Sequence, residues 1–233
     1  MSNPYFQFKQ FTVYHDLCAM KVGTDGVLLG AWTDCRGSND ILDVGTGSGL
    51  IALMLAQRSE ARIDALDIDE GACTQAICNV NNSIFKDRIN VIRSDYGDFN
   101  PEKQYDLIVS NPPYFSNSLQ ALEKKRNLAR HNHALSFEVL IKKSAELLTA
   151  KGKLALILPI EAFDIIRMHT ENAGLFLCRK TLVRPKQDVP PKRILLEYSN
   201  IKCLSVSSEI YIEKERHVYS EEFRNLTTDF YLK

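Results

Sequence analysis

The chain has 233 residues, of which 45% are apolar, and it carries 29 basic and 29 acidic side chains. This length suits one large α/β domain, and the balanced charge excludes a protein that attracts polyanions through its overall field. Any nucleic-acid site must therefore be a local patch. No stretch is apolar over the length of a membrane span, and the start of the chain lacks the apolar run of a signal peptide. We expect a cytoplasmic protein that is not bound to a membrane.

The cysteines of the chain form no Cys-x-x-Cys pair and have no histidine ligand beside them, so the spacing does not match the usual zinc patterns. We expect reduced, mostly buried thiols, with no metal site and no disulfide. They are Cys18, Cys35, Cys73, Cys78, Cys178 and Cys203.

The first predicted strand of the alternating region, residues 41–44, leads into the glycine-rich turn 45–49 and then into an apolar helix. This order is the opening half of a nucleotide-binding βαβ unit, and alternating glycines let the backbone pass close under a ligand. Two cofactors fit the turn. Residues 47–52 match the spacing of a dinucleotide site, whereas Asp43 could receive the ammonium group of S-adenosylmethionine. The glycines are Gly45, Gly47 and Gly49.

Two further strands each lead to an acid. The strand 63–67 ends in Asp67, where such sites hold a ribose hydroxyl, Asp69 is placed to cap the next helix, and Asp95 follows the strand 89–93. The glycines at 45, 47 and 49 alternate without a gap and follow the acid Asp43, and this pattern favours S-adenosylmethionine over a dinucleotide. At this point the chain resembles the class I S-adenosylmethionine-dependent methyltransferases. The resemblance implies that Asp67 holds the ribose and that Asp95 receives the adenine amino group. It extends the expected cofactor site to Asp43, the three glycines, Ile68, Tyr96 and Asn111.

A fourth strand, residues 106–110, runs into Asn111-Pro112-Pro113-Tyr114. Two successive prolines hold the backbone rigid, so the Asn111 side-chain oxygen and the Pro112 carbonyl can receive one amino group. Tyr114 then offers its ring to a planar group and Pro113 lies beside it. The same residues also fit a Pro-Pro turn in which Asn111 caps its own backbone and Tyr114 is half buried. These four residues alone do not separate the two interpretations.

The alternation of strands and helices predicts one Rossmann-like class I methyltransferase domain at 40–233, preceded by the segment 1–39. We expect a mostly parallel seven-stranded sheet with an antiparallel edge hairpin and helices on both faces. The first and fourth strands are neighbours in such sheets, so the glycine turn and Asn111 should share one crevice. The remaining predicted elements are a helix at 137–148, a fifth strand at 153–158 and a hairpin formed by 175–183 and 193–198.

Basic residues cluster after the Asn-Pro-Pro-Tyr tetrad and around the hairpin, where Asp188 is the one acid within the run. We expect both clusters to flank the crevice and to contact an RNA backbone, with a solvated loop surface as the alternative for each residue. His131 and His133 are expected to contact RNA or to support the loop. The cations are Lys124, Lys125, Arg126 and Arg130 in the first cluster, and Arg179, Lys180, Arg184, Lys186, Lys192 and Arg193 in the second.

The tetrad occurs in methyltransferases of adenine in DNA, of adenine in RNA and of glutamine in release factors, so it identifies an amine and leaves the substrate open. Residues 9–16, 20–32, 130–132 and 221–232 resemble a bacterial family of tRNA(Val) adenine-N6 methyltransferases. That resemblance implies a tRNA partner, methylation of the adenine just 3′ of the anticodon (position 37), and a segment 1–39 that covers the cofactor through Lys21, Thr24 and Asp25.

Other substrates and other classes of protein stay open at this point. Release-factor glutamine and DNA adenine are the alternative substrates. A nicotinamide-dependent oxidoreductase would use the glycine turn but would leave the tetrad without a role. A non-catalytic RNA-binding module would depend on the basic clusters alone.

Overall fold

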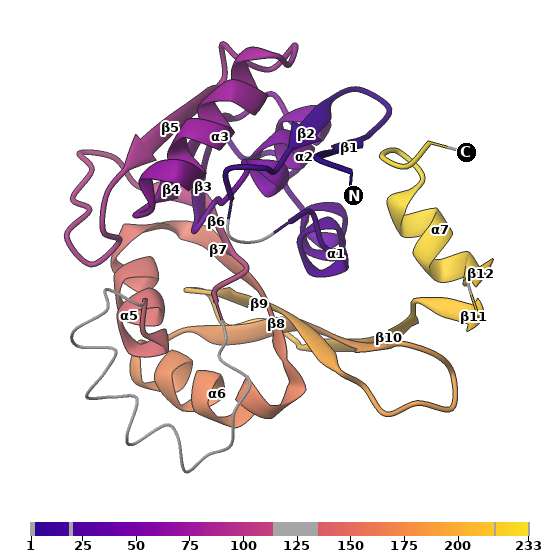
Figure 1. Cartoon of the computed structure of the whole chain (residues 1–233). Helices are drawn as coiled ribbons and strands as arrows, with labels where there is room; N and C mark the ends of the chain where they lie inside the picture. Colours follow the sequence, from indigo (N-terminus) through magenta and orange to yellow (C-terminus); the bar gives the residue numbers. More distant parts are fainter. Residues whose placement is uncertain (1–2, 19–20, 114–134, 217, 233) are drawn as a thin grey trace, which may run out of the picture.

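The computed structural model of the chain describes residues 3–18, 21–113, 135–216 and 218–232. An eight-stranded sheet lies at its centre, in the order β10-β8-β9-β7-β6-β3-β4-β5 (Figure 1). The strands of this sheet are β3 (Asp40–Val44), β4 (Arg62–Asp67), β5 (Ile89–Arg93), β6 (Tyr105–Ser110), β7 (Leu148–Pro159), β8 (Phe176–Arg184), β9 (Arg193–Ser199) and β10 (Val206–Tyr211).

Helices cover both faces of the sheet, and two small antiparallel pairs lie outside it (Figure 1). The helices are α1 (Thr24–Trp32), α2 (Leu50–Arg58), α3 (Glu70–Asn81), α5 (Phe137–Leu147), α6 (Phe163–Asn172) and α7 (Glu221–Thr227), with a 3-10 turn η1 (Ile160–Ala162). The small pairs are β1 (Tyr5–Gln7) with β2 (Thr12–Tyr14), and β11 (Glu213–Glu215) with β12 (Val218–Tyr219).

Every strand of the central sheet except β9 runs in the same direction. Parallel pairing joins β5, β4, β3, β6 and β7, and β9 is antiparallel to both β7 and β8. Strand β10 is parallel to β8. The carboxyl ends of all these strands except β9 therefore meet at one edge of the sheet. The strand order reverses between β3 and β6, and open α/β sheets bind ligands at that point.

The predicted strands at 41–44, 63–67, 89–93, 106–110 and 153–158 are confirmed, and so is the antiparallel hairpin. The hairpin is not the edge of the sheet, however, because β10 pairs outside β8 and makes eight strands instead of seven. Strand β10 was missed because its sequence, VSSEIY, has no regular alternation of apolar and polar residues and is mostly exposed. It joins the sheet through main-chain pairing, which leaves no apolar pattern to detect.

Helix α1 packs deeply against α2 and so brings the N-terminal segment to the edge of the sheet where the carboxyl ends of the strands meet. Its residues from Gly26 to Trp32 are all buried. Gly30 permits this contact, because an added Cβ would lie 2.7 Å from Met54 Sδ. This close approach places the start of α1 beside the carboxyl ends of the strands. Core residues of α1, α2 and α7 pack on one face of the sheet, while those of α5 and α6 pack on the other.

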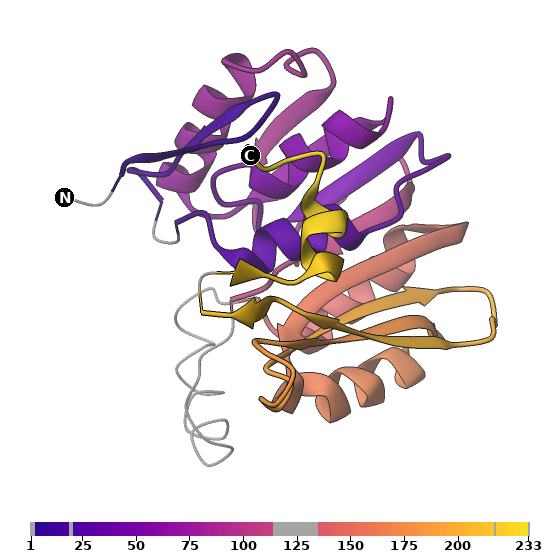
Figure 2. The ribbon, with the colours of Figure 1, turned by 90° about the vertical axis from the view of Figure 1, so that its right-hand side faces the viewer.

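The β1–β2 hairpin lies against α3 and is also joined to the C-terminal end of the chain (Figure 2). Phe8 and Tyr231 form an isolated antiparallel bridge, with ring centroids 6.0 Å apart. The Lys9 amide donates to the Phe230 carbonyl at 2.9 Å. The two ends of the chain thus hold each other. No helix among the described residues has the length and apolar character needed to cross a membrane.

The prediction of six reduced, mostly buried thiols is wrong for two reasons. Cys178 and Cys203 form a disulfide, and among the remaining cysteines only Cys35 and Cys73 are buried. The pairing could not be foreseen because it depends on β10. Cys203 lies just before β10, whose first residue pairs with Arg179, so the unpredicted strand brings the two cysteines together.

Candidate active site

The glycine-rich turn leaves an open surface at the carboxyl end of β3. Gly45, Gly47 and Gly49 have φ angles of 73°, 56° and 80°, in the left-handed region that favours glycine. A Cβ added at Gly45 or Gly47 would meet no described atom within 4 Å. The amides of Gly45 and Thr46 donate to the Leu66 carbonyl of β4 at 2.8 and 2.9 Å. Main-chain hydrogen bonds to β4 therefore hold the turn on one side, and the side toward which the Cβ positions of Gly45 and Gly47 point is open.

Asp43 supports this turn from inside the protein. Its side chain is fully buried, and Oδ2 accepts from Thr46 Oγ1 at 2.7 Å and from the Ala52 amide at 3.2 Å. Burial raises the pKa of Asp43 to about 7, an effect that these two hydrogen bonds oppose. Its Oδ1 is buried and has no hydrogen-bond partner among the described residues. The structure gives Asp43 a supporting role, and the predicted contact with an ammonium group would require Oδ1 to become accessible.

Two predicted acids stand at neighbouring strand ends. Asp67, at the end of β4, accepts from the Gly47 amide at 2.8 Å through Oδ2 and from the Asp69 amide at 3.0 Å through Oδ1. Asp69 also caps α3 as predicted, by accepting from the Ala72 amide. Asp95 follows β5, which pairs with β4, and it remains partly exposed. The carboxylates of Asp67 and Asp95 thus face the same edge as the glycine turn.

The two side chains predicted next to these acids differ in accessibility. Ile68 is 41% exposed, so it offers an apolar surface beside Asp67. Tyr96 is buried, and its hydroxyl lies 3.0 Å from Ser144 Oγ under α5. The ring of Tyr96 therefore belongs to the core, and we expect only its main chain to line a cofactor site.

Asn111 lies directly beside the glycine turn. Strand β6 pairs with β3 so that Ser110 is opposite Val44, and Ser110 Oγ donates to the Val44 carbonyl at 2.8 Å. The next residue, Asn111, has a buried Oδ1 without a hydrogen-bond partner among the described residues. That observation does not support the interpretation in which Oδ1 caps its own turn. An unpaired buried acceptor is costly, and a donor on a ligand would satisfy it.

Comparison with known proteins decides the family. The methyltransferase small domain family matches residues 22–163. A tRNA1(Val) (adenine(37)-N6)-methyltransferase from Parabacteroides distasonis is 52% identical, with all of both chains covered. The chain belongs to this methyltransferase family. Proteins of the same name from Bacteroides fragilis and Tolumonas auensis are 49% and 42% identical, again over 100% of this chain and at least 99% of theirs.

Solved structures agree with a methyltransferase fold. A predicted O-methyltransferase from Agrobacterium tumefaciens aligns with a TM-score of 0.69 at 19% identity, covering 88% of this chain and 96% of its own. A glycopeptide N-methyltransferase complexed with S-adenosyl-L-methionine aligns with a TM-score of 0.57 at 13% identity, covering 76% and 88%. The resemblance drawn from the glycine turn, the tetrad and the chain ends is confirmed.

The N-terminal segment of this methyltransferase reaches the site edge through α1. Lys21 and Thr24 are exposed, and Asp25 in the first turn of α1 pairs with Arg193 Nε at 2.8 Å. Arg193 begins β9 opposite Pro159, the last residue of β7, so this pair lies at the same edge as Asn111. A residue predicted to contact the cofactor is thus joined to one predicted to contact RNA.

The hairpin cations of the methyltransferase are less available than their sequence suggests, because four of the six form ion pairs, one with an acid of β9 and three with acids outside the hairpin. Lys192 is exposed and forms no ion pair among the described residues. Lys180 Nζ lies 5.5 Å from the Phe163 ring centroid. The pairs are Arg179 with Glu197 at 2.8 Å, Arg184 with Glu209 at 3.1 Å, Lys186 with Glu213 at 3.7 Å, and Arg193 with Asp25 at 2.8 Å.

Several predicted residues of the methyltransferase fall outside the described part of the chain. The tetrad is described up to Pro113, with Pro112 buried and Pro113 exposed. The predictions for Tyr114, Lys124, Lys125, Arg126, Arg130, His131 and His133 lie outside the described residues. No group of three or more His, Cys, Asp or Glu side chains that could hold a metal ion is found in the described ranges.

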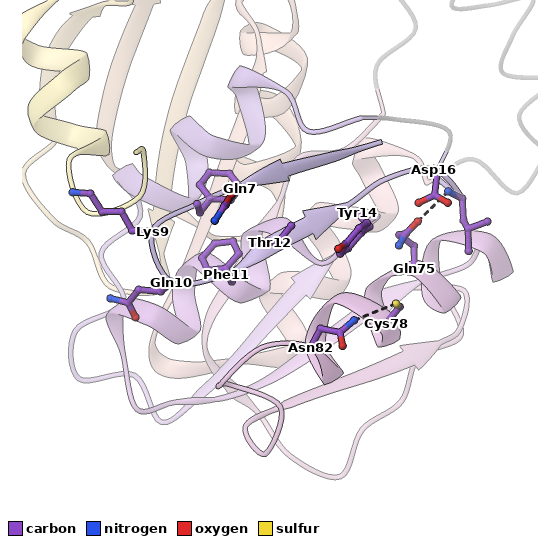
Figure 3. A pocket seen from close by; sticks show the side chains of 12 residues that line it. Gln7, Lys9, Gln10, Phe11, Thr12, Tyr14, Asp16, Gln75, Cys78 and Asn82 are labelled. Carbon is purple, nitrogen blue, oxygen red and sulfur yellow. Dashed lines mark hydrogen bonds between the residues drawn. The ribbon is translucent and has the colours of Figure 1, made fainter. Parts of the chain in front are cut away.

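A groove of about 720 Å³ lies between the β1–β2 hairpin and α3 (Figure 3). Tyr14 and Thr12 line it from the hairpin, and Gln75 and Cys78 line it from α3. Gln75 Oε1 accepts from the Leu17 amide at 3.0 Å. This groove is not the predicted cofactor site, but its walls join the N-terminal segment to the helix that follows Asp67.

Proposed function

We propose that the chain transfers a methyl group from S-adenosylmethionine to the N6 amine of adenine 37 in tRNA1(Val). The buried Oδ1 of Asn111 has no hydrogen-bond partner among the described residues and lies beside an open glycine turn, and this observation supports the reaction most directly. The full-length likeness to methyltransferases named for this reaction supports the choice of substrate. A tRNA substrate places the enzyme in the cytoplasm.

The residues at the carboxyl edge fit the cofactor. A Cβ at Gly45 or Gly47 would fill the open space above the turn, so a ligand can approach the backbone there. Each carboxylate oxygen of Asp67 accepts one main-chain amide and keeps capacity to accept a ribose hydroxyl. Ile68 supplies apolar contact and Asp95 an acceptor for an amino group. When bound, S-adenosylmethionine would supply a methyl group that is activated by its positively charged sulfur. An amine can attack the methyl carbon, and the sulfur would then leave as a neutral thioether.

Asn111 and Pro112 act on the amine that receives the methyl group. The lone pair of an exocyclic adenine amine is delocalised into the ring, so the free amine is a weak nucleophile. Its two N–H groups would donate to Asn111 Oδ1 and to the Pro112 carbonyl. Both hydrogen bonds would become stronger as the nitrogen becomes positive during the attack. No strong base is required, since the proton becomes acidic after the methyl group has moved.

The target adenine must leave its stack to reach Asn111. We expect Tyr114 to stack on the extruded base, a contact worth about 1 to 3 kcal/mol. The loop between β8 and β9 carries Lys186 and Lys192 and lies at the same edge, since β8 ends there and β9 begins there. We expect these lysines and the first basic cluster to contact the phosphates of an RNA backbone near the crevice. The segment 1–39 covers the cofactor from the α1 side.

The experiment is methyl transfer from labelled cofactor to four separate substrates. They are unmodified tRNA1(Val), the same tRNA with guanine at position 37, duplex DNA and a peptide release factor. We expect labelling of the first substrate alone, with N6-methyladenosine mapped to position 37. Labelling of the guanine variant, DNA or release factor instead would overturn the proposed substrate, while absence of transfer to all four would overturn the proposed enzyme activity.

A further inference from the structure

Asn79 is a fully buried polar side chain on α3 that neither the predicted chemistry nor the predicted cofactor contacts use. Its Nδ2 donates to the carbonyls of Ser48 and Tyr14, both at 2.8 Å, and its Oδ1 accepts from the Tyr14 amide at 2.9 Å. The carboxamide can form four hydrogen bonds, and three are made here. A buried amide satisfied to this degree fixes the orientation of every group that it contacts.

The partners of Asn79 belong to two separate parts of the chain. Ser48 lies within the glycine turn, 31 residues away in sequence, and Tyr14 ends β2, 65 residues away. The chain then continues from Tyr14 along α3, where the Leu17 amide donates to Gln75. One side chain on α3 therefore joins the turn that carries the cofactor site to the segment that is proposed to cover it.

Other interactions hold each of these parts without Asn79. The turn keeps its bonds to Leu66 and Asp67, and α3 keeps its N-cap at Asp69. Removing Asn79 should therefore leave the fold in place. It would release the Ser48 carbonyl and the Tyr14 backbone, which are the groups that set the turn and the segment relative to each other.

We infer that Asn79 is a positioning residue that couples the docking of the N-terminal segment to the shape of the glycine turn, so that cofactor affinity depends on both. This inference rests on the proposed function, because it requires the turn to bind S-adenosylmethionine. The coupling acts through two carbonyls that share one donor, and the bond to Ser48 is buried while the bond to Tyr14 is partly buried. Asn79→Asp keeps the shape of the side chain and replaces that donor with an acceptor.

The test compares Asn79→Asp with Asn81→Asp, which places the same charge on the exposed side of the same helix. S-Adenosylhomocysteine is titrated into each folded variant, and hydrogen exchange is followed at residues 12–17 and 45–49. We expect Asn79→Asp to raise the Kd by about tenfold or more, because the donor that the Ser48 and Tyr14 carbonyls share is removed. Exchange should rise in both segments together, and Asn81→Asp should behave as wild type.

The outcomes separate this inference from the proposed function. Wild-type protein that fails to bind S-adenosylhomocysteine contradicts the proposed function. If wild type binds S-adenosylhomocysteine and Asn79→Asp binds it with the same Kd, the inference alone is contradicted, even if the variant has a lower melting temperature. If Asn79→Asp does not fold, Asn79→Ala is measured in the same way. A raised Kd with faster exchange at 45–49 but not at 12–17 would also overturn the coupling.

Discussion

The cofactor half of the sheet, β3 to β5, and the hairpin half, β8 to β10, are held together by different interactions. Around the glycine turn, buried side chains such as Asp43 and Asn79 bond to main-chain groups. Around the hairpin, partly exposed cations pair with acids from distant elements, as Arg184 does with Glu209. Salt screens buried polar contacts much less than exposed ion pairs, and exposed ion pairs also contribute little to stability.

This difference separates two tasks of the enzyme. A cofactor site with fixed donors and acceptors should bind with little dependence on salt. The cations of the exposed ion pairs can exchange their carboxylate partners for RNA phosphates, so RNA binding should depend strongly on salt.

Asn111→Ala tests the point where the two tasks meet. Methylation of tRNA1(Val) under single-turnover conditions should slow on the order of 100- to 1,000-fold, since the variant lacks a hydrogen bond that strengthens with developing charge. Affinity for the cofactor and for tRNA should fall far less than the rate. A mutant in which binding and rate fall together, with a lower melting temperature, would return Asn111 to a structural role.

Asp43→Asn tests the buried support of the turn through pH. Burial raises the pKa of Asp43 to about 7, so the folded state binds a proton that the unfolded state has lost above its ordinary value of 3.8. The contribution of Asp43 to stability is therefore complete below pH 3.8 and is lost as the pH rises through about 7. Denaturant unfolding at a series of pH values should show wild type losing about 4 kcal/mol relative to Asp43→Asn across that range. A constant difference would show that Asp43 has no raised pKa.

Asp67→Ala tests the ribose contact. Removal of its acceptors should weaken S-adenosylhomocysteine binding by about 1 to 3 kcal/mol, with the same effect at low and high salt. The matched control is Asp87→Ala, which removes an exposed carboxylate from the same half of the sheet. Isothermal titration measures both variants. Equal affinity of Asp67→Ala and Asp87→Ala would remove Asp67 from the site.

Replacing Lys186 and Lys192 by alanine should have the smallest effect and should act on RNA alone. The slope of log K for tRNA against log salt should fall by about 0.7 to 0.9 for each phosphate that the variant no longer neutralises. Lys151 and Lys202, exposed near the opposite edge of the sheet, give the control pair. Filter binding across a salt series compares the two double variants. Identical slopes would assign the loop lysines to a solvated surface.

The parts of the site that the sequence predicts correctly are local in the chain. The glycine turn, Asp67 and Asn111 each follow directly on an apolar strand, so a strand pattern is enough to place them at one edge. Tyr96 shows the limit of this reasoning. It also follows a strand end, yet its ring turns inward to Ser144, because its orientation depends on packing under α5.

The hairpin half was predicted less well because its partners are remote in sequence. The acids that pair with Arg193 and Lys186 come from α1 and β11, and no local pattern connects them. The Cys178–Cys203 disulfide depends on the mostly exposed strand β10. Asn79 was overlooked for the same reason, since a polar residue within a helix usually faces solvent and its partners lie 31 and 65 residues away.

We propose that one edge of the sheet holds the cofactor at Asp67 and the target amine at Asn111. Wild type, Asp67→Ala and Asn111→Ala are titrated with S-adenosylhomocysteine and with a bisubstrate compound that links the cofactor to the N6 of adenosine. Asp67→Ala should weaken both ligands, whereas Asn111→Ala should weaken mainly the bisubstrate compound, which wild type binds more tightly than S-adenosylhomocysteine. A bisubstrate compound that gains nothing over S-adenosylhomocysteine, or an Asn111→Ala variant that binds both ligands equally more weakly, would contradict the claim.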